Sequence, residues 1–325
     1  MVTKHKTSWV VWLRRLSQAG WFVLFCYLFL ATAYHPINKA GRGVDFFFNL
    51  DPLIALSGWL ASHTLVRATL LSLTTLAVTL ICGRWFCGWI CPFGTLHHFL
   101  SSLRAGSAKQ KIDAGLYTRW QHVKYYLLAG FIGASLVGLN VVGWLDPIAF
   151  LFRSLATSIY PALNKSTVAV FTWIYNTDPG VGRVRVTVAS EPIYGFLRAH
   201  LLAADQPYFQ GSLFIGALFV TVAALNLYRT RFWCRYVCPL GALLGVVGKN
   251  PVVRLHKHPE KCNSCRLCVV NCQGGATPDD AAQWKPAECL YCWNCRSDCP
   301  EQAISFGGRR KQEKKRDEPL VQVDR

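Results

Sequence analysis

The stretch from Cys262 to Pro300 reads C-N-S-C-R-L-C-V-V-N-C, then sixteen other residues, then C-L-Y-C-W-N-C-R-S-D-C-P. The spacing C-x2-C-x2-C-x3-C therefore occurs twice within one short stretch. A [4Fe–4S] cluster needs four thiolates at the corners of a small tetrahedron, so three come from one tight loop and the fourth comes from elsewhere in the chain. The doubled spacing predicts two such clusters, held by eight cysteines.

The doubled spacing resembles that of the bacterial two-cluster ferredoxins, in which the fourth cysteine of each run ligates the other cluster. One departure is Gln273, which follows Cys272 where the ferredoxin pattern has the proline seen at Pro300. This departure affects the turn after Cys272 and leaves all eight cysteines in place. The resemblance implies that cluster I binds Cys262, Cys265, Cys268 and Cys299, and that cluster II binds Cys289, Cys292, Cys295 and Cys272.

Two zinc sites and a disulfide framework are the alternative uses of these cysteines. A zinc site needs only four cysteines in paired C-x2-C units. The sequence instead repeats the full C-x2-C-x2-C-x3-C spacing twice, which zinc binding does not require. Disulfides need an oxidising compartment, whereas the charge distribution described below places the cysteines on the reducing side of a membrane. Iron–sulfur clusters are therefore the preferred interpretation.

The composition favours a membrane protein over two soluble domains. Of 325 residues, 52% are hydrophobic and only 16% are charged, with twelve Trp and one Met, and the mean hydropathy is positive. The formal charge of +18 comes from Lys and Arg at the ends of apolar runs rather than on one polar face. This distribution argues against nucleic acid as a partner and for membrane lipid.

Apolar runs at residues 19–34, 64–83, 125–145 and 211–228 predict four transmembrane helices. The loop between the second and third runs carries six basic residues and one acid, Asp113. By the positive-inside rule, the N-terminus, this loop and the cysteine-rich C-terminal domain are cytoplasmic. The first run also has the basic start and small residues of a cleavable signal peptide, which remains an open alternative.

The segments between these runs predict shorter elements. Asp51 and Asp146 are each followed by proline, and each predicts a helix start because the carboxylate caps free N–H groups and proline suits the first helical position. Residues 148–160 and 167–175 are apolar but too short to span, so we expect interfacial helices there. Residues 181–189 alternate in polarity and predict a small hairpin.

The membrane part contains an internal repeat. In each half a span leads into Arg-aromatic-aromatic-Cys-x3-Cys-Pro-x-Gly, and membrane proteins use such repeats to build a shared site at the repeat interface. The hypothesis is that these four thiols converge at the cytoplasmic membrane edge as a third redox or metal site. Helix packing and a thiol pair that oxidises to a disulfide are the alternatives, and the spacing does not decide what the site binds. The four residues are Cys87, Cys91, Cys234 and Cys238.

His97 and His98 lie near the same edge and are candidate quinone contacts, because imidazole exchanges protons near physiological pH. The alternative for both is a hydrogen-bonded interfacial role. For His63 and His122 as well, a hydrogen-bonded interfacial role is preferred over haem ligation. The sequence has no convincing G-x-G-x-x-G or phosphate-loop motif, so it makes no case for NAD or ATP.

From Trp9 to Phe306 the chain resembles the polyferredoxin-type membrane proteins. This family includes the quinol-oxidising membrane subunit of periplasmic nitrate reductase systems and the C-terminal half of the nitrous oxide reductase regulator. The resemblance implies a multi-pass protein of the bacterial inner membrane that exchanges electrons between the quinol pool and a partner redox protein. The long loop after Asp146 has no counterpart in the family pattern, and neither the flavin-binding domain of the regulator nor the outer-side electron acceptor is identified.

The expected fold is an α-helical integral membrane protein of two pseudo-repeats, residues 1–248, followed by a two-cluster ferredoxin-like α+β domain, residues 249–307, and a charged disordered tail, residues 308–325. The expected function is iron–sulfur electron transfer, as a quinol dehydrogenase or an electron-transfer subunit. The alternative is a redox-sensing or metalloenzyme-biogenesis protein that uses its clusters to reduce a metal or report redox state. Only the first function predicts that a quinol reduces the clusters.

Overall fold

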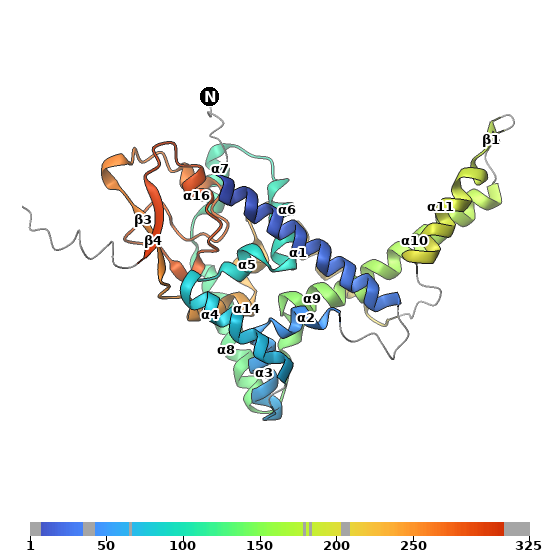
Figure 1. The fold of residues 1–325 in the computed structure, drawn as a ribbon, viewed down its shortest axis with the longest axis horizontal. Helices are drawn as coiled ribbons and strands as arrows, with labels where there is room; N and C mark the ends of the chain where they lie inside the picture. The colour runs from blue at the N-terminus through green and yellow to red at the C-terminus, as the bar shows by residue number, and fades with distance from the viewer. Residues whose placement is uncertain are drawn as a thin grey trace, which may run out of the picture.

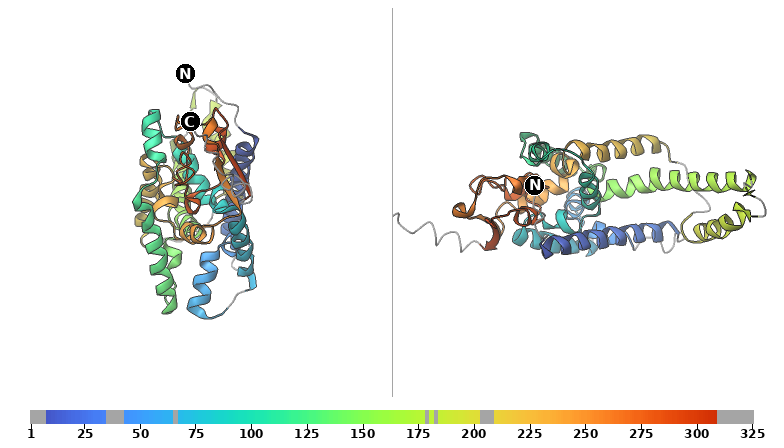
Figure 2. Two further views of the ribbon diagram at one scale, coloured as in Figure 1. Left: turned by 90° about the vertical axis from the view of Figure 1, so that its left-hand side faces the viewer. Right: turned by 90° about the horizontal axis from the view of Figure 1, so that it is seen from above.

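The structure is a computed structural model, and it describes residues 8–34, 43–64, 67–177, 180–181, 184–202 and 209–308. The described part is a helical body with a cysteine-rich unit seated at one end and a helical arm at the other (Figure 1). In the view from above, α1, α10 and α12 all extend away from the cysteine-rich unit (Figure 2). The predicted tail beyond residue 308 lies outside the described residues.

The elements follow one another as helices of very different lengths and two small sheets. The helices before the middle of the chain are α1 (Trp9–Tyr34), α2 (Asp45–Asn49), α3 (Pro52–Ser62), α4 (Ser72–Cys82), α5 (Trp85–Trp89), α6 (Pro92–Ser102), α7 (Ala108–Gly115) and α8 (Val123–Leu136). The later helices are α9 (Pro147–Ser154), α10 (Tyr160–Thr177), α11 (Val186–His200), α12 (Ser212–Tyr228), α13 (Phe232–Tyr236), α14 (Pro239–Val247), α15 (Leu267–Val270) and α16 (Asn294–Ser297). The strands are β1 (Gly180–Val181), β2 (Val184–Arg185), β3 (Val253–Lys257) and β4 (Ile304–Gly308).

The internal repeat appears as two equivalent runs of helices, α4–α5–α6 and α12–α13–α14. In each run a five-residue helix carries the first cysteine, and the second cysteine caps the helix that follows. Pro92 and Pro239 occupy the first turn of that helix, where their missing N–H is not needed. Each Cys-Pro therefore begins a helix, and the two cysteines of each pair lie on either side of a break in the helix.

Within the described residues, one helix is long and apolar enough to cross a membrane, with a window from Trp9 to Thr32. Pro52–Ser62, Thr69–Cys82 and Ser212–Tyr228 form apolar helices that are shorter than this. The prediction of four spans is thus supported for the first run and stays a prediction for the other three.

The region after Asp146 differs from the two separate interfacial helices that hydropathy predicts. α9 continues through a π-helical turn, Leu155–Ile159, directly into α10, so helical backbone runs without a gap from Pro147 to Thr177. The π turn comes just before Pro161, which lacks an N–H for a regular helical hydrogen bond. The predicted hairpin is present as β1 and β2, which pair antiparallel, but residues 186–189 begin α11 instead of extending the second strand.

The two ends of the cysteine-rich unit pair with each other as a small sheet. β3 enters it and β4 leaves it, and the two strands pair antiparallel with Leu255 opposite Phe306. α15 packs against α7, and the short 3₁₀ turn Pro286–Glu288 packs against α14. The unit therefore lies directly on the helices that carry the Cys-x3-Cys-Pro elements.

Candidate functional site

Two cavities in the cysteine-rich unit are each lined by four of its eight cysteines. The cavity lined by Cys262, Cys265, Cys268 and Cys299 has a volume of about 220 Å³. A smaller one is lined by Cys272, Cys289, Cys292 and Cys295. Each cavity takes three cysteines from one run and the fourth from the other run. This grouping is the one that the ferredoxin resemblance implies.

The backbone between the cysteines repeats the same unusual conformation in both runs. Ser264 and Arg266 have φ of 58° and 57°, and the equivalent Tyr291 and Trp293 have φ of 48° and 61°. Residues other than glycine rarely adopt this left-handed region, because the side chain then crowds the following carbonyl group. Two equivalent left-handed residues in each run bend both loops in the same way around their cavities.

Several of these thiols are buried, and burial disfavours the thiolate. Burial, followed by the charge of Asp279, raises the pKa of the Cys268 thiol to about 12. Burial also raises the pKa of Cys295 well above its usual value, and the neighbouring Cys292 adds to the effect. Such thiols are neutral near pH 7 and ionise when a metal centre binds, so cluster assembly must release protons.

The four cysteines of the repeat elements are buried together in the core of the helical body. Cys87, Cys91 and Cys238 belong to the main hydrophobic cluster, and Cys234 is also buried. Burial, followed by Cys87 and Cys234, raises the pKa of Cys91 well above its usual value, and burial with Cys234 and Cys87 does the same for Cys238. All four thiols thus lie in the core of the helical body, and the shared site that the repeat predicts stays a prediction.

The repeats hold each other through crossed arginines. Arg84 donates from Nη2 to the carbonyl of Cys234 at 3.1 Å, and Arg231 donates from Nη1 to the carbonyl of Cys87 at 2.9 Å. Both guanidinium groups are fully buried. Each arginine lies three residues before the first cysteine of its own element and bonds the first cysteine of the other element. This reciprocal pattern fixes the two elements face to face.

Glycines leave room for this arrangement. A Cβ at Gly241 would lie 2.4 Å from Nη2 of Arg84, and a Cβ at Gly94 would lie 2.7 Å from the carbonyl oxygen of Cys87.

Within the part of the chain that the structure describes, no three His, Cys, Asp or Glu side chains are grouped for a single metal ion. A cubane spreads its four ligands over separate corners, so its cysteines lie farther apart than those of a single ion.

A loop of the cysteine-rich unit lies directly on the first repeat element. Gly88 lies between Cys87 and Cys91, and a Cβ there would be 2.3 Å from the carbonyl oxygen of Leu290. The indole N–H of Trp89 donates to the carbonyl of Tyr291 at 3.0 Å. Leu290 and Tyr291 are the residues between Cys289 and Cys292. The element that carries Cys87 and Cys91 and the loop between Cys289 and Cys292 are thus in direct contact.

A buried carboxylate, Glu288, forms the polar centre of this contact. Its Oε2 accepts from Arg84 Nη1 at 3.2 Å, from Gln121 Nε2 at 3.1 Å and from Nζ of Lys124, and its Oε1 accepts from the hydroxyl of Tyr125 at 2.9 Å. All these charged groups are almost completely buried. Glu288 immediately precedes the cluster ligand candidate Cys289. It therefore links the cysteine-rich unit to both the arginine of the first repeat and helix α8.

The two helix-capping aspartates also meet. Asp51 caps α3 and Asp146 caps α9, and in each case one carboxylate oxygen accepts two backbone N–H groups, as the sequence predicts. Both carboxyl groups are fully buried, and burial followed by the charge of Asp146 raises the pKa of Asp51 well above its usual value. Burial raises the pKa of Asp146 as well. Asp51 and Asp146 thus lie near each other in the core, and each repeat contributes the same residue.

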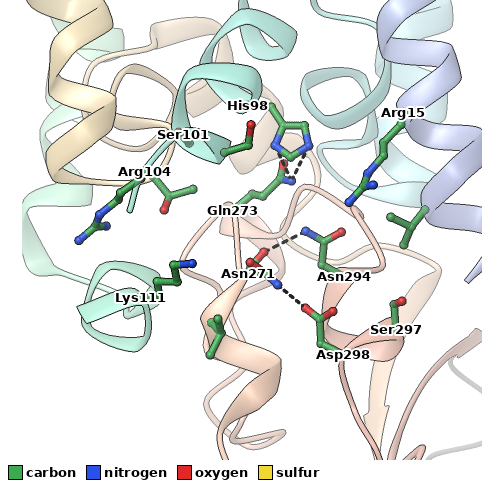
Figure 3. A pocket seen from close by; sticks show the side chains of 14 residues that line it. Arg15, His98, Ser101, Arg104, Lys111, Asn271, Gln273, Asn294, Ser297 and Asp298 are labelled. Carbon is green, nitrogen blue, oxygen red and sulfur yellow. Dashed lines mark hydrogen bonds between the residues drawn. The ribbon is translucent and has the colours of Figure 1, made fainter. Parts of the chain in front are cut away.

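The two histidines that were candidate quinone contacts face different surroundings, His97 the helix α12 and His98 a polar cavity. His97 is buried, and its Nδ1 lies 2.7 Å from Oδ1 of Asn226 in α12. His98 lines a polar cavity and contacts Gln273 Nε2 through its Nδ1 at 3.0 Å (Figure 3). Burial lowers the pKa of His97 to about 4, and burial with the nearby Arg231 lowers that of His98 to about 2. Both rings are therefore neutral near pH 7.

Sequence reasoning missed the residues that join the parts of this site, namely Arg84, Arg231, Gly88 and Glu288. The arginines carry a signal, since each stands at the same offset before a Cys-x3-Cys pair. A buried carboxylate next to a cysteine ligand has no such signature, because its cationic partners lie more than 160 residues away in the sequence.

A family model described as "4Fe-4S binding domain" matches the chain twice, at residues 64–111 and 211–258. Each copy contains one Cys-x3-Cys-Pro element, and both copies end before Cys262, the first of the eight cysteines. The match therefore falls on the internal repeat and supports iron–sulfur binding by this chain.

Curated relatives share this pattern at low identity. The ferredoxin-type protein NapH of Escherichia coli is 25% identical over 93% of this chain and 90% of its own length. The putative electron transport protein YccM of the same organism is 25% identical over 72% of this chain and 53% of its own length. The regulatory protein NosR of Pseudomonas aeruginosa is 27% identical over 68% of this chain, which spans only 24% of that relative. No solved structure matches the chain significantly. By its two 4Fe–4S domains and these relatives, the chain resembles the polyferredoxin-type 4Fe–4S proteins, NapH and NosR among them.

Proposed function

We propose that this iron–sulfur electron-transfer protein exchanges electrons between the quinol pool and a partner redox protein. The observation that carries the proposal is the contact of the Cys289–Cys292 loop with Gly88 and Trp89 of the first repeat element. A [4Fe–4S] cluster supplies reversible one-electron transfer where it is bound. The contact brings the ligand residues of two candidate centres together without an intervening layer of protein.

The eight ferredoxin-type cysteines are proposed to hold two [4Fe–4S] clusters. The two four-cysteine cavities and the repeated left-handed turns around them support this assignment. Backbone N–H groups already point at the sulfur atoms, from Ala276 to Cys272 at 3.4 Å and from Ala303 to Cys299 at 3.3 Å. Such N–H to sulfur hydrogen bonds stabilise a cluster and tune its potential.

The four core cysteines are proposed to hold a third iron–sulfur centre. The match of a 4Fe–4S binding domain to both repeat elements supports this, as do the crossed arginines. The buried guanidinium groups of Arg84 and Arg231 place two positive charges beside the thiols and offset the charge of thiolates. The polar residues of this region thus suit a negatively charged centre.

The iron and acid-labile sulfide content of anaerobically purified protein tests this third centre. Two clusters supply about eight irons per chain and three supply about twelve. We expect about twelve, falling to about eight when all four core cysteines are replaced by Ser. Cys26→Ser is the matched control, since Cys26 is a half-buried free cysteine in α1. A content of eight irons in both the unchanged protein and the four-cysteine variant would show that the core thiols hold no cluster.

A cavity of about 690 Å³ between α1, α5 and the β3–β4 sheet is proposed to receive the quinol ring in place of the histidine site. Its walls include Trp85 and Trp89, which stack at 5.3 Å, and also Tyr291 and Trp293, which flank Cys292. Ligand pockets of this size are mostly lined by apolar and aromatic groups. Quinol oxidation releases two electrons and two protons, so one-electron carriers must accept the electrons in turn.

Quinol-driven reduction of the clusters, followed by their visible absorbance, tests the quinol assignment. We expect Trp85→Leu to slow this reduction about tenfold, because it removes one ring of the stack. Trp173→Leu, on the exposed surface of α10, should leave the rate unchanged. Dithionite should reduce both variants fully. If no quinol reduces the unchanged protein while dithionite does, the quinol function is wrong and the redox-sensing or biogenesis function takes its place.

The membrane arrangement belongs to the same proposal. Four spans, with the N-terminus and the ferredoxin-like unit in the cytoplasm, are proposed for a bacterial inner-membrane protein. The basic loop between α4 and α8 supports the orientation. α1 supports at least one crossing.

A further inference from the structure

A polar cavity of about 240 Å³ lies between α1, α6, α7 and the loops of the cysteine-rich unit. Figure 3 shows Arg104 and Lys111 on one side of it, Arg15 on the other side, and Gln273 between them below His98. This cavity is separate from the aromatic cavity proposed for quinol, because the two share no lining residue.

The charges that line the cavity are mostly positive. Arg15, Arg104 and Lys111 come from three different segments, and Asp298 is the one acidic residue in the lining. Asp298 already accepts a hydrogen bond from Asn271 Nδ2 at 2.9 Å. His98 adds no charge, because its ring is neutral near pH 7. The cavity therefore has an excess of positive charge that an anion would balance.

Two polar atoms in the walls lack hydrogen-bond partners among the described residues. Gln273 is 2% exposed, and its Nε2 contacts His98 while its Oε1 has no partner. Arg104 donates from Nη2 to the carbonyl of Gln110, but its buried Nη1 has no partner. Leaving buried polar groups unpaired costs free energy, so both atoms favour a partner inside the cavity. A ligand that offers an acceptor to Arg104 and a donor to Gln273 would pair both atoms.

The position of the cavity indicates where such a ligand comes from. Arg15 lies near the start of α1, the one described helix long and apolar enough to cross a membrane. Trp9 and Trp12 are exposed on the same end of α1, as expected of an aromatic belt at the headgroup level. Basic cavities at this level bind the head groups of acidic phospholipids.

We propose that this cavity binds a phosphate-bearing anion with a hydroxyl group, supplied by the head group of an acidic phospholipid. The phosphate oxygens accept from Arg15, Arg104 and Lys111, and the hydroxyl donates to Oε1 of Gln273. This site requires neither quinol nor any redox partner.

The bound anion would also act on the neighbouring clusters, a consequence that rests on the proposed function. Asn271 and Gln273 flank Cys272, and Asp298 precedes Cys299. Reduction adds negative charge to a cluster, so an anion held close by favours the oxidised form and lowers the midpoint potential. Lipid occupancy therefore tunes the potential of the ferredoxin-like unit.

Binding of a short-chain phosphatidylglycerol to the purified full-length protein in detergent, followed by native mass spectrometry, tests the site. Arg15→Gln, Arg104→Gln and Lys111→Gln should each weaken binding about fivefold. Arg104→Lys keeps the charge and should largely retain binding. Lys109→Gln is the matched control, because Lys109 lies on the same helix as Lys111 and does not line the cavity.

Competing anions identify the source of the phosphate. If glycerol phosphate and inorganic phosphate fail to displace the lipid, the acyl chains contribute and the site is a lipid site. If they displace it at equal concentration, the site still binds phosphate, and the source is a soluble anion. The proposal is overturned if phosphatidylcholine binds equally well, or if the three Gln variants bind like the unchanged protein while remaining folded by thermal unfolding. Lipid binding followed by mass does not depend on electron transfer by the clusters. Failure of this proposal is therefore distinguishable from failure of the electron-transfer function.

Discussion

Glu288→Gln should lower the free energy of unfolding by about 3–5 kcal/mol, the usual cost of leaving a buried charge without its partner. The amide keeps the shape of the side chain but removes the negative charge that Arg84 and Lys124 share. Both cations would then remain buried between the cysteine-rich unit and the helical body. Thermal unfolding in detergent measures the change, and the iron content shows whether the second cluster is lost with it.

A matched control and a rescue separate this effect from general damage. Glu301→Gln changes an exposed glutamate of the same unit, so it should change the unfolding temperature little. Adding Lys124→Met to Glu288→Gln removes one of the unpaired cations and should recover part of the stability, which a double-mutant cycle measures. Equal unfolding temperatures for Glu288→Gln and Glu301→Gln would contradict the role of Glu288 as the carboxylate that joins the two parts.

Gly88→Ala should separate the cysteine-rich unit from the first repeat element. A Cβ at this position would lie 2.3 Å from the carbonyl oxygen of Leu290, far inside van der Waals contact, and the obstacle is backbone rather than a flexible side chain. Such overpacking costs about 1–3 kcal/mol. The Cys289–Cys292 loop must therefore move away from Cys87 and Cys91. We expect quinol to reduce the clusters much more slowly, while dithionite still reduces them.

Gly58→Ala is the matched substitution, because a Cβ at Gly58 in α3 meets nothing within 4 Å. It should leave both the unfolding temperature and quinol-driven reduction unchanged. If Gly88→Ala is reduced by quinol as fast as Gly58→Ala, electrons do not cross at this contact. The relay would then have to reach the ferredoxin-like unit by another surface.

Local sequence patterns predicted the parts of this molecule that depend on neighbouring residues. The Asp51 and Asp146 caps act through the backbone within one turn, so the sequence displays them. The continuous arm from Pro147 to Thr177 was missed for a related reason. Polar residues around Lys165 interrupt the apolar run, although the backbone remains helical through them.

The contacts between distant segments could not be predicted in this way. Arg84 reaches Cys234, and Lys124 reaches Glu288, across more than 140 residues of chain. A buried charge in the sequence looks like any surface charge until its partner is located in space. The spans were predicted from hydropathy alone, and the second, third and fourth fall on helices of at most 17 residues, Thr69–Cys82, α8 and α12.

The crossed arginines have the form of a two-fold symmetric interface. In such an interface residue i of one partner contacts residue j of the other, and j of the first contacts i of the second. Arg84 with Cys234 and Arg231 with Cys87 obey this relation, and the buried Asp51 and Asp146, one from each half, lie near each other. The two halves of the chain therefore meet as the subunits of a homodimer would, joined by a covalent linker. A gene encoding only one half would carry two of the four core thiols and could complete the set by pairing with a second copy of itself.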